Sequence, residues 1–168
     1  ETGRVIGVDM TPEMIERAWE NAKRDGFENV EFRLGDIERL PVDANTADCV
    51  ISNCVINLSP DKDRVFGEAF RVLKPGGRLM VSDIVLLKAL PAAVRDSIEA
   101  YIGCLAGASL KGEYMKAIEK AGFDNIRIID EISFPVEFAV NDPVAQSIME
   151  KSNLSLEDVR DLARTVVS

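Results

Sequence analysis

Arg4-Val5-Ile6-Gly7-Val8-Asp9-Met10-Thr11-Pro12 is the stretch that decides the fold, because it joins an apolar run to an acid and a helix start. The run up to Val8 is short and partly β-branched, which predicts a buried strand. Thr11 is a good N-cap, Pro12 suits the first helical position, and Gly26 is a typical stop. The stretch therefore predicts a strand followed directly by a helix.

The rest of the chain repeats this alternation. Further strands are predicted at Asn29–Leu34, Ala47–Ser52, Arg78–Leu86 (after a Lys74–Gly77 turn) and Asn125–Asp130, which Ile132–Phe138 could continue. Further helices are predicted at Asp61–Leu73, with Val65, Ala69, Val72 and Leu73 facing inward, and at Pro91–Leu105, Lys111–Ala121, Asp142–Lys151 and Ser155–Val166. Strands separated by helices indicate an α/β fold with a doubly wound, mostly parallel sheet.

Composition narrows the class of protein. The 168 residues, 46% hydrophobic and 29% charged, suit one globular domain with a sizeable core. The net charge of −9 would repel phosphate backbones and anionic lipids, so we expect neither nucleic-acid nor membrane binding. No apolar run approaches the roughly 20 residues of a membrane span, and no leader opens the chain. A cytoplasmic protein with free thiols is expected, since three cysteines do not suit a disulfide framework.

The sequence contains no histidine. This excludes Ser-His-Asp and Cys-His catalytic sites, His-rich zinc sites and the usual proton shuttle. Any catalysis must use carboxylates, thiols, hydroxyls, amides or a cofactor.

Cys54 follows the predicted strand Ala47–Ser52, at the carboxyl end where open parallel sheets bind ligands. A thiol there can be a nucleophile or a ligand, or it can simply pack. Cys49 lies five positions earlier, and an odd separation along a strand points the two side chains to opposite faces. We therefore expect Cys49 to be core packing.

Two acids follow the first two predicted strands. Asp9 stands where nucleotide-binding folds place an acid that accepts hydrogen bonds from ribose hydroxyls, although it could equally stabilise the next helix. Asp36 could accept from an adenine amino group, although Gly35-Asp36 is also a common turn. Taken singly, neither acid decides between a ligand site and a structural role.

The order of Asp9, Gly35-Asp36, Asn53 and the Lys74–Gly77 turn resembles class I S-adenosylmethionine-dependent methyltransferases, which have a Rossmann-like fold. A finer resemblance is to the arsenite methyltransferases of that class. It rests on the segments Val8–Met14, Ser52–Pro60, Val81–Ile84 and Tyr101–Ala108, which include Asn53-Cys54-Val55-Ile56-Asn57-Leu58 and Gly103-Cys104-Leu105-Ala106-Gly107-Ala108.

This resemblance implies a site and a reaction. Cys54 and Cys104 match the cysteines that hold arsenic(III), a soft ion that thiolates suit. Without the resemblance, Cys104 would be a buried helix residue. The cofactor would lie against Asp9, Met10, Asp36, Ile37 and Asn53, although Met10 could instead be a hydrophobic staple. Thiolate-bound arsenic would attack the sulfonium methyl with its lone pair, so no general base is needed. A thiol reductant and a role in arsenic detoxification are also implied.

The chain departs from the family at its ends. It has no Gly-x-Gly-x-Gly loop, no upstream cysteine and no final antiparallel strand. We therefore expect a chain truncated at both ends, with residues 1–140 a partial methyltransferase domain and residues 141–168 a C-terminal helical extension. The absent first strand would leave two sheet edges unpaired, which predicts rearrangement or a homo-oligomer. We also expect this fragment to lack activity on its own.

Two other functions remain open at this stage. The acceptor could be a small organic molecule, as in methyltransferases of quinone biosynthesis. Alternatively, the domain could bind arsenite without catalysis.

Overall fold

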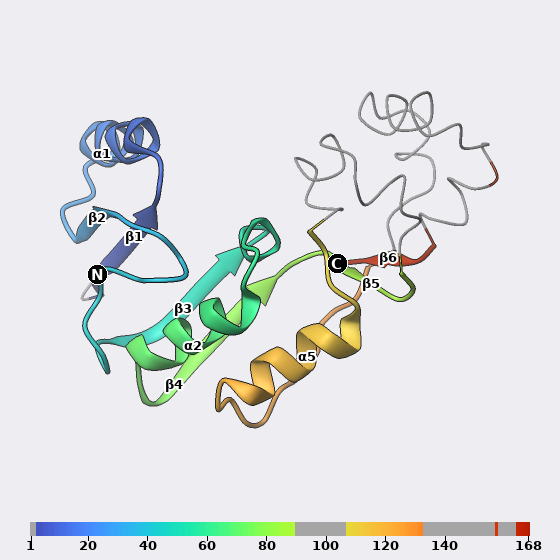
Figure 1. The fold of residues 1–168 in the computed structure, drawn as a ribbon. Coiled ribbons are helices and arrows are strands. Elements are labelled where there is room, and N and C mark those ends of the chain that lie inside the picture. The colour runs from blue at the N-terminus through green and yellow to red at the C-terminus, as the bar shows by residue number, and fades with distance from the viewer. Residues whose placement is uncertain (1–2, 90–106, 133–156, 158–163) are drawn as a thin grey trace. The chain divides into compact units, whose positions relative to one another are not determined.

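The computed structural model describes residues 3–89, 107–132, 157 and 164–168 (Figure 1). They fall into two compact units, each described by itself below. The first comprises Glu1–Val50 and Arg64–Leu79, and the second comprises Ile51–Asp63 and Met80–Ser168. None of the helices in the described ranges is both long and apolar enough to span a membrane.

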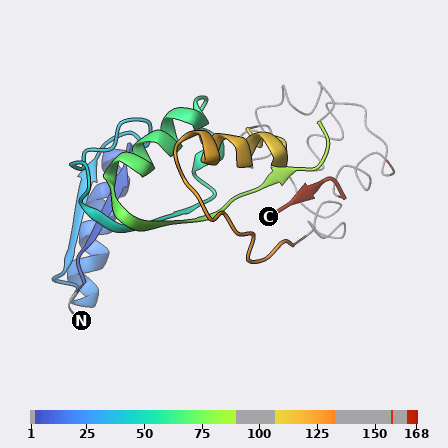
Figure 2. The same cartoon turned by 90° about the horizontal axis from the view of Figure 1, so that it is seen from below.

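The first unit opens with the predicted strand-helix-strand arrangement. β1 (Val5–Asp9) and β2 (Val30–Leu34) pair in parallel, and α1 (Pro12–Asp25) joins them and lies against both (Figures 1 and 2). The helix begins at Pro12 and ends before Gly26, whose φ of 74° is the left-handed conformation that glycine adopts most easily. Both boundaries are as predicted.

The packing between α1 and the strands centres on Phe32. Its ring meets the edge of Trp19 from α1, with 5.1 Å between ring centroids and an interplanar angle of 87°. On the neighbouring strand, Gly7 pairs with Phe32, and a Cβ added at Gly7 would lie 2.6 Å from the Phe32 ring. Glycine at this position therefore makes room for the aromatic ring. Trp19 remains 45% exposed.

A second pair of strands, β3 (Ala47–Asn53) and β4 (Leu73–Ser82), is connected through η1 (Ile56–Leu58) and α2 (Lys62–Val72). The apolar side of α2 forms most of the local core, as predicted. Its buried members are Val65, Phe66, Ala69 and Val72, followed by Leu73 at the start of β4.

The second unit contains an antiparallel pair. β5 (Val85–Leu86) pairs with β6 (Val166–Val167), and α5 (Lys111–Lys120) contacts β5 (Figures 1 and 2). Leu86, Val166 and Val167 are all buried. In the described ranges the strands therefore pair two by two, and β1 and β3 each have one strand partner.

Four expectations about secondary structure are wrong. The predicted strand Arg78–Leu86 is interrupted after Ser82, so that β4 and β5 are separate strands with different partners. Asn125–Asp130 is not a strand: no described strand pairs with it, and Ile129 is 86% exposed. The predicted Lys74–Gly77 turn lies within β4, where Gly76 has a φ of 79°. Val166 belongs to β6 and not to a helix, because it pairs with Leu86.

Other expectations fall outside the described residues. These are the helices Pro91–Leu105 and Asp142–Lys151 and most of Ser155–Val166. The same holds for residues 133–138 of the proposed strand continuation, although Ile132 exchanges two backbone hydrogen bonds with Ser168. The boundary at residue 140 and the homo-oligomer stay predictions.

Candidate functional site

The carboxyl ends of β1 and β2 bring the first two predicted site positions together. Asp9 pairs with Leu34 in the parallel register, and the Gly35 N–H donates to the Asp9 carbonyl at 2.9 Å. The carboxylate Oδ1 of Asp9 accepts from the Thr11 N–H at 2.8 Å, so it also orders the entry to α1. Met10 lies between these two residues and is 72% exposed. This edge thus presents a half-buried acid beside an exposed apolar side chain.

The loop after β2 is organised around Asp36. Its Oδ1 accepts from the Glu38 N–H at 2.8 Å, and its carbonyl accepts from the Arg39 N–H at 3.0 Å. Asp36 is exposed and Ile37 is half-buried. In the described ranges, the second carboxylate oxygen of Asp36, like that of Asp9, accepts no hydrogen bond from the chain. Both acids therefore combine a structural bond with a remaining acceptor for a ligand.

Asn53 and Cys54 belong to the second unit, at the end of β3. Asn53 is exposed and Cys54 is half-buried. Cys54 has a φ of 55°, a left-handed conformation that costs a residue with a Cβ about 1–2 kcal/mol. Its N–H donates to the Ser82 carbonyl at 2.9 Å, which ties this strained residue to the end of β4. Strain of this kind is common at binding sites.

The electrostatics around Cys54 are set by burial and by Asp83. Burial raises the pKa of the Cys54 thiol, and the negative charge of Asp83 raises it further. Asp83 is itself only 7% exposed, and burial raises the pKa of its carboxyl. The buried Tyr114 hydroxyl donates to Asp83 Oδ2, whereas Asp83 Oδ1 has no hydrogen-bond partner among the described atoms. The thiol at the end of β3 therefore has a buried carboxylate as its neighbour.

The residues around η1 add further buried polar groups. Asn57 is 1% exposed, and its Nδ2 donates to the Ile84 carbonyl at 2.7 Å. Lys62 donates to the carbonyls of Gly107 at 2.8 Å and of Ser59 at 3.3 Å, and burial lowers the pKa of its amine. A Cβ at Gly107 would lie 2.0 Å from the Asn57 carbonyl oxygen. Only glycine allows this close approach.

Sequence reasoning assigned no role to Asp83, Tyr114 or Lys62. A signal for Asp83 was present, because it is an acid at the end of an apolar strand, just as Asp9 is. Tyr114 had no comparable signal: its pairing with Asp83 depends on how α5 packs.

The structure therefore places the predicted site residues in two groups. Asp9, Met10, Asp36 and Ile37 come together in the first unit, whereas Asn53 and Cys54 are adjacent in the second. Cys104 lies outside the described residues. Cys49, expected in the core, is exposed, so that prediction is wrong: Ile51 and Asn53, which alternate with it on the same face of β3, are exposed as well.

The fold described above is that of a methyltransferase domain. The family model described as "Methyltransferase domain" matches residues 1–122, and the chain belongs to this family. Its fold is the Rossmann-like fold of class I methyltransferases, as expected from the sequence.

Within that class, the chain is similar to arsenite methyltransferases. An arsenite methyltransferase of Halobacterium salinarum is 49% identical over 75% of this chain and 32% of its own length. That of Aquipseudomonas alcaligenes is 40% identical over 77% of this chain and 40% of its own. The crystal structure of an arsenic(III) S-adenosylmethionine methyltransferase from Chlamydomonas reinhardtii is similar with a TM-score of 0.74 and 37% identity, over 90% of this chain and 52% of that one. The chain thus spans between a third and about half of the length of these proteins.

Proposed function

We propose that the protein carrying this chain methylates arsenite with S-adenosylmethionine as the methyl donor. The observation that carries the proposal is the 49% identity to an arsenite methyltransferase over 75% of the chain. The match of residues 1–122 to the methyltransferase domain spans both cysteines of the expected arsenic site. In a cytoplasmic setting with a thiol reductant, the reaction would serve arsenic detoxification.

The first unit offers a fitting place for the cofactor. Asp9 and Asp36 lie at one edge of the β1–β2 pair, and each uses one carboxylate oxygen for a backbone N–H. The remaining oxygens are acceptors, which suits the ribose hydroxyls at Asp9 and the adenine amino group at Asp36. Exposed Met10 and half-buried Ile37 supply apolar contact nearby. Asn53, at the end of β3, is proposed as a further cofactor contact. The bound cofactor would supply an electrophilic methyl group.

The second unit offers the arsenic ligand Cys54, with Cys104 as its expected partner. A thiolate is a suitable ligand for soft arsenic(III). Burial and Asp83 raise the pKa of Cys54, so the free thiol is protonated at neutral pH and releases its proton when arsenic binds. Two thiolates would hold the arsenic with its lone pair free for the methyl group.

The test measures arsenite methylation by the full natural protein and two matched variants. Cys54→Ser should abolish the activity because serine is a poor ligand for arsenic(III). Cys49→Ser changes the same residue type on the same strand, at an exposed position, and should leave the activity unchanged. If Cys54→Ser methylates arsenite as the wild type does, the proposed arsenic site is wrong.

The same variants separate the alternatives. Transfer to a small organic acceptor that survives Cys54→Ser would indicate a methyltransferase of the quinone-biosynthesis type. Calorimetry that detects arsenite binding but no S-adenosylmethionine binding would instead indicate a non-catalytic arsenite-binding domain. Applied to the 168-residue chain alone, the two assays test the expectation that this fragment is inactive.

A further inference from the structure

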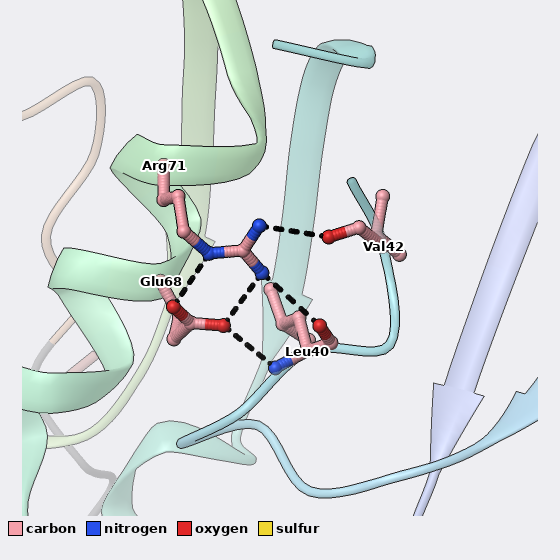
Figure 3. A network of polar contacts seen from close by, with 4 residues as sticks. All are labelled: Leu40, Val42, Glu68 and Arg71. Carbon is pink, nitrogen blue, oxygen red and sulfur yellow. Dashed lines mark hydrogen bonds and ion pairs between the residues drawn. The ribbon is translucent and has the colours of Figure 1, made fainter. Parts of the chain in front are cut away.

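The loop between β2 and β3 is held near its middle by two side chains of α2. Arg71 of α2 donates from Nη2 to the Leu40 carbonyl at 3.1 Å and from Nη1 to the Val42 carbonyl at 2.9 Å (Figure 3). Glu68, one turn earlier on α2, accepts from the Leu40 N–H at 2.8 Å. Three backbone groups of one short segment are therefore bonded to a single helix.

Glu68 and Arg71 also fix each other. Arg71 Nε lies 2.7 Å from Glu68 Oε1, and Nη2 lies 2.7 Å from Oε2, which is a bidentate pair (Figure 3). The Glu68 side chain is 17% exposed, and the bonds from Arg71 lower the pKa of its carboxyl. The guanidinium is thereby held in the orientation that serves the two carbonyls.

The start of this loop is in contact with its middle. A Cβ at Gly35 would lie 2.6 Å from the ring of Pro41, so the loop closes tightly just before Asp36. Arg33 donates to the Pro41 carbonyl at 2.6 Å, and the Gly35 N–H is bonded to Asp9. Gly35 and Pro41 are the chain neighbours of Asp36 and Leu40. Because Gly35 and Pro41 touch, a displacement of Leu40 would also displace Asp36.

We infer that Glu68 and Arg71 are positioning residues for the cofactor, which hold the loop of Asp36 in the conformation that receives the adenine. The inference rests on the proposed function, since it takes Asp36 as a cofactor contact. Neither residue needs to touch the ligand. Their effect is to keep the binding-competent loop populated, and apparent affinity falls in proportion to that population.

The test measures S-adenosylmethionine binding to the full natural protein by calorimetry. Arg71→Met keeps an aliphatic side chain but removes all four hydrogen bonds of the guanidinium shown in Figure 3. If the loop then spends about a tenth of its time in the competent conformation, Kd rises about tenfold. Glu68→Gln is a milder second variant that should raise Kd in the same direction. At saturating cofactor, kcat should change by less than about twofold, since the pair acts on binding.

A matched control removes a different ion pair from the same unit. Lys74 Nζ lies 2.8 Å from Asp48 Oδ1, and both residues belong to the β3–β4 pair. Among the described residues, this ion pair makes no bond to the loop of Asp36. Lys74→Met should therefore leave Kd unchanged. Thermal unfolding of each variant separates loss of the fold from loss of the loop conformation.

A double variant distinguishes positioning from general stabilisation. If Arg71 acts through Asp36, then Arg71→Met should add less than about twofold to the Kd of Asp36→Asn, because coupled residues are not additive. Fully additive effects, or wild-type affinity in both Arg71→Met and Glu68→Gln, would overturn the inference and leave the proposed function standing. A wild-type protein that binds no S-adenosylmethionine would overturn the proposed function, and the inference with it.

Discussion

Tyr114→Phe removes the hydroxyl that serves the buried carboxylate beside Cys54. Asp83 is 7% exposed and Tyr114 is 5% exposed, so water does not readily replace the lost donor. The hydroxyl donates to Asp83 Oδ2, and Asp83 Oδ1 already has no hydrogen-bond partner among the described atoms. Phenylalanine keeps the ring and its packing. The substitution therefore removes the hydrogen bond to a buried carboxyl group and keeps the aromatic ring.

The free energy of unfolding that Tyr114→Phe loses should be larger near neutral pH than in acid. A hydrogen bond to a charged group contributes about 1.5–3 kcal/mol, and one between neutral groups about 1 kcal/mol. Burial raises the folded-state pKa of Asp83, so the unfolded chain loses this proton first and stability falls as pH rises between the two pKa values. The Tyr114 bond lowers the folded pKa in part, so its loss widens that window. The destabilisation should therefore grow with pH.

Urea unfolding of wild type and Tyr114→Phe at about pH 4.5 and about pH 7.5 tests this. We expect a loss of about 2–3 kcal/mol at the higher pH and about 1 kcal/mol at the lower. Asp63→Asn is the control: it removes an exposed ion pair with Lys120 in the same unit and should change stability little at either pH. An equal loss at both pH values would refute the coupling between the Tyr114 hydrogen bond and the ionisation of Asp83.

Two further predictions concern Gly7 and Asp83. Gly7→Ala should destabilise by about 1–3 kcal/mol in urea unfolding, because the new Cβ meets the Phe32 ring. Gly67→Ala is the control: it lies in α2 with nothing within 4 Å of the added Cβ and should stabilise the protein by about 1 kcal/mol. Equal effects at the two glycines would contradict the explanation by packing against Phe32. Asp83→Asn should lower the pKa of Cys54, because it removes the nearby negative charge. Iodoacetamide should then alkylate Cys54 faster at a given pH, with exposed Cys49 as the internal standard. An unchanged alkylation profile would argue against charge coupling between Asp83 and Cys54.

The first strand-helix-strand unit was predictable because its signals are local. Pro12 and Gly26 mark the ends of α1 through backbone constraints that act within one turn. The parallel pairing of β1 with β2 then follows from the crossover through α1, since parallel strands need a connection of this kind. With the pairing comes the placement of Asp9 and Asp36 at one edge of the strand pair, so the proximity of these two acids was predictable from the sequence.

The strand predictions failed where a pairing partner, rather than the β-propensity of the segment itself, decides whether the segment forms a strand. Asn125–Asp130 has the composition of a strand, but no described strand pairs with it. Val166 has a helical pattern before it, yet it pairs with Leu86, which lies far away in the sequence. A single-sequence pattern gives the preference of a segment and not the presence of a partner.

The side-chain contacts of Glu68 and Arg71 on α2 were likewise not predictable from the sequence, because they depend on a segment that lies elsewhere in the chain. The sequence places Glu68 and Arg71 three residues apart beside the apolar stripe of α2, a spacing that suits an ion pair on the helix surface. Their bonds to Leu40 and Val42 depend on where the loop after β2 passes, and that is fixed by the contact of Gly35 with Pro41. A charged pair on a helix acquires a specific role only when a backbone segment with unpaired carbonyls lies over it. Such roles must therefore be sought from the backbone groups of a binding loop outward, and not from the charge pattern of the helix.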